Sequence, residues 1–188
     1  MVKIPRGEKG PKGQPKWPEL RLKADQVDAY FDRPCNIGLI LDPATNWWVD
    51  VDLDRCEAVL AAPFFFAQTL TYGHDERPRS HRIFRCVGAK PKQCQFEGGK
   101  PLLEIRAKGA QSVIPPSLHP TGGQYRYAKP ALPVREIDVV TLCTAAGRTA
   151  AAALFAQQWA GGRHYKARDL SGALLHAGWS DGEVINFI

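Results

Sequence analysis

Four features that would assign the protein to a particular class are missing from its 188-residue sequence. The five cysteines are an odd number and include no Cys-x-x-Cys pair, which argues against a zinc knuckle and favours free thiols in a reducing, cytoplasmic compartment. Cys86 and Cys94 could still share a metal with His74 or His81, although no set of four ligands is visible. We find no signal peptide and no apolar run long enough to span a bilayer, so no membrane partner is expected. No internal repeat is visible either.

The chain is long enough and apolar enough for a folded domain with a small appendage. Hydrophobic residues make up 44% of the sequence, which allows a buried core and argues against global disorder. The formal net charge of +6 is a modest basic excess and is consistent with a polyanionic partner. The charge alone does not establish that partner, because many basic proteins bind no nucleic acid.

Composition divides the chain into three regions. Residues 1–18 consist mainly of Lys, Gly and Pro, and we expect a flexible basic N-terminal segment that cannot pack a core. Residues 19–133 alternate short predicted strands with few helices, which favours an α+β domain with an antiparallel or mixed sheet. Residues 134–188 are Ala-rich and helix-periodic, and predict a small helical module. Because the sequence stops inside an apolar helix, we expect that module to be truncated from a longer protein.

The individual elements are predicted from alternating apolar residues and from turn residues. Strands 36–41 and 47–53 are separated by Asp-Pro-Ala-Thr-Asn and predict a β-hairpin, as do strands 102–107 and 112–115 around Lys-Gly-Ala. Ser180 and Glu183 have the spacing of a capping box at the start of the last helix. The other expected elements are helices 20–31, 55–62, 137–160, 165–177 and 180–187 and strands 80–86 and 124–127.

The strongest local feature is a set of three aspartates at alternate positions near residue 52. Residues two apart on a strand point to the same face, so Asp50 and Asp52 are predicted to project side by side between apolar neighbours. Two such carboxylates repel each other and lose hydration, and a divalent cation removes both penalties. Mg²⁺ and Mn²⁺ take oxygen ligands, and two-metal sites use such pairs for phosphoryl transfer. A solvated sheet face is the alternative for the pair, and an N-cap of the following helix is the alternative for Asp54.

A basic loop over residues 72–82 leads into the next predicted strand. It contains three arginines, a serine and two histidines, and the arginines, the serine and a histidine can together hold a triphosphate. A lone Ser-His pair is weak evidence, because a structural histidine is the usual default. The candidate nucleotide-binding residues in this loop are Arg77, Arg79, Ser80, His81 and Arg82.

A third acid, Glu104, lies in the middle of a predicted strand between apolar neighbours, an expensive position for an isolated charge. It could complete a three-carboxylate site, or it could form a salt bridge with Arg106, which points to the same face. Further along, Pro115-Pro116 fixes a rigid extended segment that can position Ser117 and His119. Further candidates for binding nucleotide or template phosphates are Arg106, Ser117, His119 and the lysines of the N-terminal segment.

Taken in order, these blocks resemble the bifunctional DNA primase/polymerase (Prim-Pol) N-terminal domain of the archaeo-eukaryotic primase superfamily. The family pattern is an Asp-x-Asp strand, a Ser-His strand after a basic loop, and an acid on a later strand. Here these look like Asp50-Val51-Asp52, Ser80-His81 and Glu104. The resemblance covers about residues 15–188. Two departures are that His74 stands where relatives commonly have a basic residue after glycine, and that the third acid is Glu where some relatives have Asp.

The resemblance implies a nucleotidyltransferase that synthesises and extends strands on a single-stranded DNA template from NTPs or dNTPs. Residues 19–133 would form the catalytic domain, in which Asp50, Asp52 and Glu104 hold two Mg²⁺ or Mn²⁺ ions. Ser80 and His81 would hold the phosphates of the incoming nucleotide. Such domains occur on mobile genetic elements and are often fused to a helicase, so a helicase domain or partner is expected.

Two other functions stay open from the residues alone. A metal-dependent nuclease would use the same carboxylates for cleavage, although Arg106 stands where a common nuclease arrangement has Lys. A non-catalytic nucleic-acid-binding module would explain the charge and the sheet, but not three acids on apolar strands.

Overall fold

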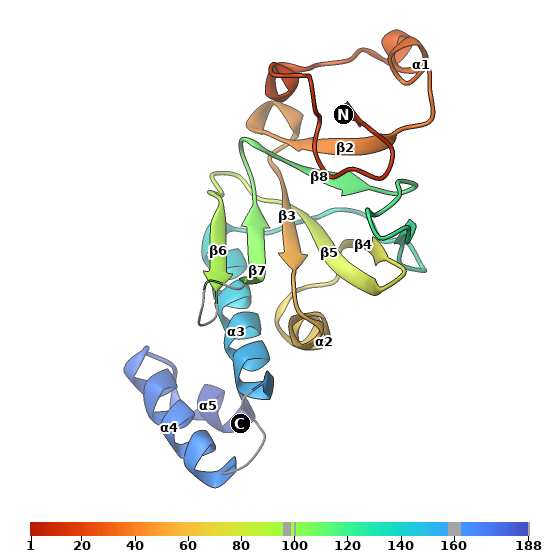
Figure 1. The fold of residues 1–188 in the computed structure, drawn as a ribbon. Helices are drawn as coiled ribbons and strands as arrows, with labels where there is room; N and C mark the ends of the chain where they lie inside the picture. Colours follow the sequence, from red (N-terminus) through yellow and green to blue (C-terminus); the bar gives the residue numbers. More distant parts are fainter. Residues whose placement is uncertain (96–98, 100, 158–162, 188) are drawn as a thin grey trace. The chain divides into compact units, whose positions relative to one another are not determined.

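The computed structural model describes residues 1–95, 99, 101–157 and 163–187, and it separates into two compact units. The first unit runs from Met1 to Ala153 and the second from Leu154 to Ile188. The first unit contains the β-sheets and the second contains helices, so the predicted α+β class with C-terminal helices is confirmed (Figure 1).

Within the described residues, the first unit forms two sheets whose strands run crosswise to one another (Figure 1). The smaller sheet has the antiparallel order β1-β2-β8, with β1 (Val2–Ile4), β2 (Asn36–Leu41) and β8 (Ala110–Ile114). The larger sheet has the order β6-β7-β3-β5-β4-β9, and β10 adds to β5 in parallel. Its strands are β3 (Trp48–Leu53), β4 (Leu70–His74), β5 (Arg77–Arg85), β6 (Lys92–Gln95), β7 (Pro101–Arg106), β9 (Tyr125–Tyr127) and β10 (Arg135–Glu136).

The strands of the two predicted β-hairpins form at the expected places, but they do not pair with each other. β2 pairs with β1 and β8, whereas β3 pairs with β5 and β7. The chain therefore leaves the small sheet after β2 and returns to it between β7 and β8 (Figure 1). Turn residues predict a change of direction, but the strand that supplies the hydrogen-bond partner comes from elsewhere in the sequence, so the hairpin prediction is wrong in both cases.

The N-terminal segment differs from the flexible stretch expected for residues 1–18. Val2 and Ile4 are fully buried and join Leu41 and Tyr72 in the core between the sheets. Two apolar residues at alternate positions are enough for an edge strand when β2 offers a free side, and β1 takes that place. The following residues are tied down by Asn36, whose side-chain amide donates to the Glu8 carbonyl at 2.9 Å.

The first unit also contains helices, which differ in length from those expected from the sequence. Where one helix was expected over residues 20–31, the chain forms the short helix α1 (Val27–Tyr30) after two 3₁₀ turns. The expected helix over 55–62 is present and extends further, as α2 (Cys56–Phe65). Among the described residues, 3₁₀ turns include Trp17–Glu19, Ala24–Gln26 and Pro43–Thr45.

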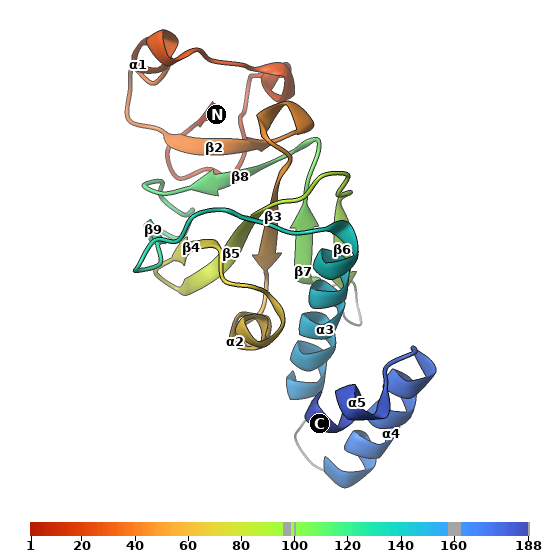
Figure 2. The same cartoon turned by 180° about the vertical axis from the view of Figure 1, so that it is seen from behind.

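Helix α3 (Val139–Gln157) lies beside β6 and β7 in both views (Figures 1 and 2). Asp138 caps its start, because the amide of Thr141 donates to Asp138 Oδ1 at 2.8 Å. Leu142, Ala146 and Ala153 are buried, so the first unit continues past residue 134, where we expected a domain boundary. No spanning run was expected from the sequence, yet α3 is long and apolar enough to cross a membrane by length and composition, a test that a buried core helix also passes.

The second unit contains α4 (Arg163–His176) and α5 (Asp181–Phe187). The predicted capping box is present at α5: the Ser180 amide donates to Glu183 Oε2 at 3.0 Å, and the Glu183 amide donates to Ser180 Oγ at 3.3 Å. Three helices were expected after residue 134 and α3 to α5 correspond to them, although residues 158–160 of the first expectation lie outside the described residues.

Candidate active site

The register of the large sheet brings the predicted acidic residues together. Asp52 of β3 lies opposite His81 of β5 on one side and opposite Glu104 of β7 on the other. Asp50, two residues earlier on the same face, lies opposite Arg106. Five residues from three separate sequence blocks therefore share one face of the sheet, because β3 is the strand between the other two.

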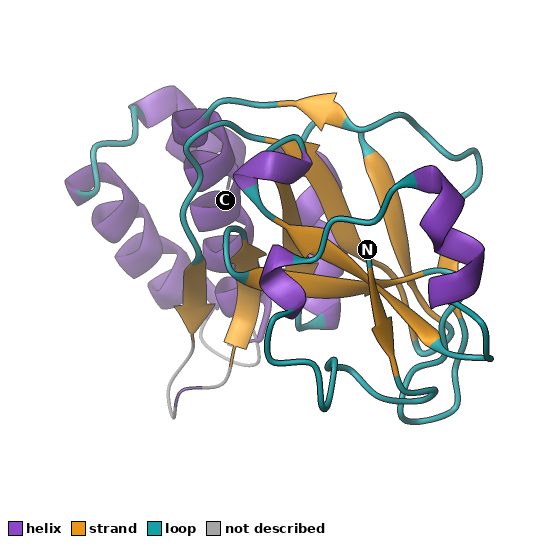
Figure 3. Cartoon of the chain, turned by 90° about the horizontal axis from the view of Figure 1, so that it is seen from above, coloured by secondary structure: helices purple, strands orange, loops and turns teal. Residues whose placement is uncertain are grey.

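A pocket of about 300 Å³ opens beside this face and is lined from both sheets. The large sheet contributes its acidic and basic side chains, and β8 of the small sheet contributes the opposite wall. The lining residues are Lys9, Pro11, Trp17, Asp52, Asp54, His74, Arg77, Ser80, His81, Glu104, Arg106, Ala110, Gln111, Val113 and Tyr125. Figure 3 shows both sheets from above.

Asp50 and His81 form a buried ion pair. His81 Nδ1 lies 2.9 Å from Asp50 Oδ2 and 3.7 Å from Asp52 Oδ1, and Asp50 is 0% exposed. Burial by itself raises the pKa of Asp50, but the charge and hydrogen bond of His81 outweigh it and lower the pKa. Burial likewise lowers the pKa of His81, but Asp50 and Asp52 outweigh it and raise the pKa. The imidazolium and the carboxylate therefore stabilise each other's charged forms.

The second oxygen of Asp50 has no such partner. Asp50 Oδ1 is buried and accepts no hydrogen bond from the described residues. The Ser112 hydroxyl on β8 is near enough to lower the pKa of Asp50, but it forms no hydrogen bond of standard geometry with it. Asp50 was expected at the metal site beside Asp52, and the structure places it deeper, next to the pocket wall formed by His81 rather than in the pocket lining itself.

Arg106 binds the other two predicted acids. Its Nε donates to Glu104 Oε2 at 3.0 Å, and its Nη2 lies 3.5 Å from Asp52 Oδ2. Burial lowers the pKa of Arg106, but Asp52, Asp50 and Glu104 together raise it above its ordinary value. The salt bridge kept as an alternative for Glu104 is thus present, and the same guanidinium also reaches Asp52.

Asp54 faces the pocket and does not cap the helix that follows it. The N-cap position of α2 is Arg55, without a side-chain capping bond. Burial and the neighbouring charge of Asp52 raise the pKa of Asp54. Arg77 Nη1 lies 3.9 Å from Asp54 Oδ1 and opposes that shift. Asp54 is therefore a fourth carboxylate of the site.

The basic loop is divided between two pockets. Arg77, Ser80 and His81 line the acidic pocket, whereas Arg79 and Arg82 line a separate one. The division follows from a bulge, because the pairing of β4 with β5 shifts register between Tyr72 and His74 and Arg79 has a φ of +62°. The five loop residues predicted to bind one triphosphate are thus not brought together.

Gly73 is what allows the bulge. A Cβ atom at this position would lie 2.3 Å from the Arg77 carbonyl oxygen and 2.6 Å from the Arg79 amide nitrogen. Both are backbone atoms, so no side-chain rotation could relieve the contact. Only glycine lets β4 approach β5 closely enough here.

The two candidates after the paired prolines lie outside the acidic pocket. Ser117 is buried and its Oγ accepts a hydrogen bond from the Ile37 amide at 2.8 Å, so it joins this segment to β2. His119 stacks on His74 with ring centroids 4.0 Å apart. Of this pair only His74 lines the pocket.

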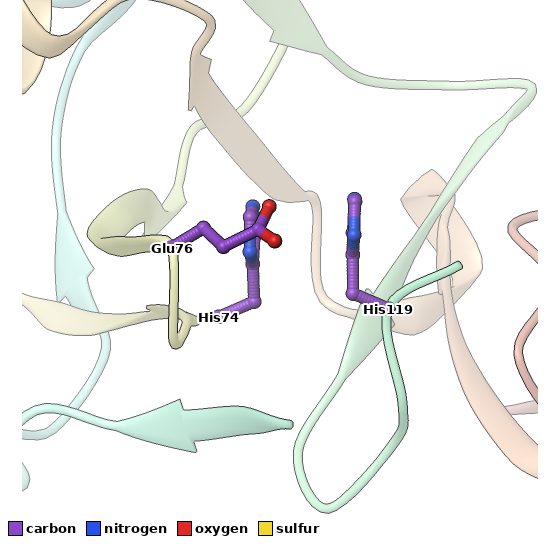
Figure 4. A group of neighbouring side chains, drawn as sticks. All are labelled: His74, Glu76 and His119. Carbon is purple, nitrogen blue, oxygen red and sulfur yellow. The ribbon is translucent and has the colours of Figure 1, made fainter. Parts of the chain in front are cut away.

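His74, Glu76 and His119 form a group that could hold a metal ion, since one ligand atom of each lies within 4.8 Å of the others (Figure 4). Burial and then His119 lower the pKa of His74 to about 4, so its ring is neutral at pH 7. The two ring planes are only 6° apart, however. Because imidazole lone pairs lie in the ring plane, two parallel rings cannot direct them at one ion until one ring turns.

Sequence reasoning missed Trp17 and Gln111 of the pocket lining, and also Tyr72, which packs on the pocket residue His81. Tyr72 is fully buried and stacks on His81 at 4.6 Å, which fixes the imidazole against the acids. Trp17 reaches the pocket because β1 anchors the N-terminal segment, and so does Lys9, one of the N-terminal lysines named as candidates from the sequence. Gln111 holds that segment by donating to the Lys9 carbonyl at 2.6 Å. No local pattern marks these residues, since each depends on a partner distant in the sequence.

The pocket lies inside a region of recognisable sequence. A family model described as bifunctional DNA primase/polymerase, N-terminal, matches residues 1–140 of the 188. The match includes every residue that lines the acidic pocket and confirms the resemblance drawn from its motifs. None of the curated proteins matches the chain.

Proposed function

Because the chain belongs to the family of bifunctional DNA primase/polymerase N-terminal domains, we propose that it makes and extends nucleic-acid strands on a single-stranded DNA template. The reaction would be two-metal nucleotidyl transfer from NTPs or dNTPs. One observation carries the proposal: Asp52 on β3, Asp54 just after the end of β3 and Glu104 on the neighbouring β7 reach a single pocket. A cation bound among them would relieve the burial and repulsion that raise the pKa of Asp54.

The donor atoms suit Mg²⁺ or Mn²⁺. Both are hard cations that take oxygen ligands, and the acids of this face offer carboxylate oxygens. Asp50 Oδ1 is a buried acceptor without a hydrogen bond from the described residues, as expected of an oxygen that binds a cation. We assign the metal-holding role to Asp50, Asp52 and Glu104, with Asp54 as a further ligand. Ions held there would lower the pKa of the attacking 3′-hydroxyl and neutralise charge on the triphosphate.

Two cations of the protein occupy the same region. His81 Nδ1 lies between Asp50 and Asp52, and Arg106 lies between Asp52 and Glu104. Both side chains line the pocket, so they remain beside the reacting groups when the acids turn toward metal. Their charge then becomes available to phosphate oxygens, which are the other anions of the reaction.

The phosphates of the incoming nucleotide have a further set of donors. Ser80 is buried, lines the pocket, and its Oγ has no hydrogen-bond partner among the described residues. Arg77 lines the same pocket and offers a planar fork for bidentate binding of phosphate oxygens. We propose that Ser80, His81 and Arg77 hold the triphosphate. A helicase domain or partner, which the family resemblance suggests, would supply the single-stranded template.

The test is a gel assay of the full chain with single-stranded DNA, with and without a labelled primer. Reactions contain Mg²⁺ or Mn²⁺ and either NTPs or dNTPs. The active-site variant is Asp52→Asn/Glu104→Gln, and the matched control is Asp25→Asn/Asp28→Asn, which removes two exposed carboxylates outside the pocket. Far-UV circular dichroism checks that both variants are folded.

Products that lengthen with added nucleotide, disappear in the active-site variant and persist in the control would support a polymerase. Products formed without primer would add priming. If the template shortens without nucleotide, the protein is a nuclease and the proposal is wrong. If DNA is bound without any change in length, the chain acts as a binding module.

A further inference from the structure

A second pocket, of about 250 Å³, lies on the other side of β5 and is strongly basic. Its lining comes from α2, β4, β5 and the segment after β9, which Figure 2 shows running across this face of the sheet. Arg79, Arg82 and Lys129 contribute three cationic groups. The lining residues include no acid. The two arginines are those that the bulge separates from the acidic pocket.

Arg82 is the least satisfied of these cations. It is 6% exposed, and its Nε is buried and donates to no acceptor among the described residues. A buried charge without a partner is costly, and proteins normally supply a carboxylate or a ligand. Arg106 on the opposite face shows the usual arrangement, with Glu104 and Asp52 beside it. The charged neighbour of Arg82 is Arg79 rather than a carboxylate. Burial, and to a smaller extent the like charge of Arg79, lower the pKa of Arg82.

The remaining lining favours a compact oxyanion. Gln68 and Thr71 add polar groups at the rim of the pocket. The planar guanidinium of Arg82 matches two oxygens of a tetrahedral anion, and Arg79 and Lys129 bring further positive charge. Three cations without an acid suit a phosphate better than a singly charged carboxylate, because more of the charge is neutralised.

We propose that the pocket formed by Arg79, Arg82 and Lys129 binds a phosphate group at a site separate from the acidic pocket. The phosphate belongs either to the backbone of a nucleic-acid strand or to a free phosphate compound such as a nucleotide. The chemistry is the same for both sources, and their sizes distinguish them. The inference does not depend on polymerase activity, since it rests on the charges and burial at this pocket alone.

The experiment measures binding to the full chain by isothermal titration calorimetry, with EDTA present so that divalent ions play no part. The probes are inorganic phosphate, a dNTP and a short single-stranded oligonucleotide. Arg79→Gln and Lys129→Gln change exposed side chains and should leave the fold intact. Arg85→Gln is the matched control, because it removes the same charge from β5 at a residue that pairs with Glu136 outside the pocket.

Phosphate binding that weakens roughly tenfold in Arg79→Gln and Lys129→Gln, but not in Arg85→Gln, would support the site. The phosphate comes from a nucleic-acid strand if oligonucleotide binding weakens in the same variants as phosphate binding. The slope of the logarithm of the binding constant against the logarithm of the salt concentration should then fall by about one. If only phosphate and dNTP respond, the phosphate comes from a free compound. Equal binding in all variants, or an equal loss in the Arg85→Gln control, would overturn the proposal.

Arg82→Leu gives an independent readout, because leucine removes the buried charge. Without ligand, its melting temperature should equal or exceed that of the wild type, and added phosphate should raise the wild-type value but not that of the variant. A lower melting temperature in Arg82→Leu together with an unchanged response to phosphate would show that Arg82 is structural and that the pocket is not a phosphate site.

Discussion

His81 and Arg82 are neighbours on β5, yet the two faces of this strand give them opposite electrostatic surroundings. His81 lies among carboxylates, its Nδ1 2.9 Å from Asp50, and its pKa is raised. Arg82 lies in a pocket lined by Arg79 and Lys129 without an acid, and its pKa is lowered. The basic loop looks uniform in sequence, but the pleat of the strand and the bulge at Gly73 divide it into one half that meets acids and one that does not.

The comparison indicates what each face can bind. On the acidic face His81 and Arg106 are already paired with carboxylates, and the carboxylate oxygen atoms that remain suit a cation. On the basic face no described residue forms an ion pair with Arg79, Arg82 or Lys129, and these groups suit an anion. Residue type alone would not separate these cases, because both faces contain arginines that the sequence places within six residues of each other.

The largest effect is expected from a substitution that breaks the ion pair between Asp50 and His81. Asp50→Ala should lower the free energy of unfolding by about 3–5 kcal/mol, because it removes the buried carboxylate 2.9 Å from His81 and leaves only Asp52 at 3.7 Å. Urea denaturation followed by tryptophan fluorescence measures the change. The matched variant Asp52→Asn should lose far less stability, since Asp52 lies at the pocket surface. Equal losses in the two variants would contradict the distinction between a buried and an open aspartate.

The next largest effect tests whether the acidic face of the sheet carries the reaction. Asp52→Asn should reduce nucleotide incorporation by about 10²–10³-fold, because it removes a charged ligand from the proposed metal site. Primer extension under single-turnover conditions measures the rate. Asp28→Asn, an exposed aspartate on α1, serves as the control and should retain the wild-type rate. A rate in Asp52→Asn within a few fold of wild type would remove Asp52 from the site.

A smaller effect concerns the bulge that separates the two faces. Gly73→Ala should lower the free energy of unfolding by about 1–3 kcal/mol, because the new Cβ would lie 2.3 Å from a backbone carbonyl. Gly10→Ala is the matched control, since a Cβ there meets nothing within 4 Å. Thermal denaturation compares the two. A Gly73→Ala protein as stable as the Gly10→Ala control would mean that the bulge tolerates a side chain.

The smallest expected effect is a pH dependence limited to the acidic face. The raised pKa of His81 gives stability that is fully present below its ordinary value of 6.5 and is lost as the pH rises through the folded-state pKa. The lowered pKa of Asp50 gives stability that is present above 3.8 and is lost as the pH falls through its folded-state pKa. This pair therefore contributes most between these two values.

Melting temperatures from pH 5.5 to 9 test that dependence. The wild-type value should fall with rising pH relative to Asp50→Ala, which has lost the pair. Arg82→Gln should follow the wild-type curve, because arginine stays charged over this range. If the wild-type and Asp50→Ala curves are parallel, the Asp50–His81 pair does not titrate as the structure indicates.

Local patterns predicted much of the site. Alternation placed Asp50 and Asp52 on one face, and the structure adds Glu104 from the adjacent strand as expected. The Ser180–Glu183 capping box was also visible in the sequence and is present. The aspartate pair and the capping box depend on residues at fixed short spacings. The position of Glu104 is notable because a charge between apolar neighbours is costly wherever it is buried. Each of these features can therefore be recognised from the few residues around it.

Other features could not be predicted in this way. Asp54 was ambiguous because a helix N-cap and a pocket ligand have the same local pattern, and only the position of β7 makes it a neighbour of Glu104. The two hairpins were wrong because the pairing partners of β2 and β3 lie far away in the sequence. Val2 and Ile4 were assigned to a flexible segment because a three-residue strand has no signal of its own.

The sequence by itself determined the α+β class and the approximate positions of β2, β3, β5, β7, β8 and β9, but not those of β1, β4, β6 and β10. It also determined the carboxylates that repel one another unless a cation is present. The tertiary structure alone decided which strands share a sheet, which arginines face the acids and which side chains are buried without a partner. The physical reason is that periodicity and turn chemistry act within a few residues. Strand register, burial and electrostatic pairing are set instead by contacts between distant segments, as Asp50 and His81 show across 31 residues.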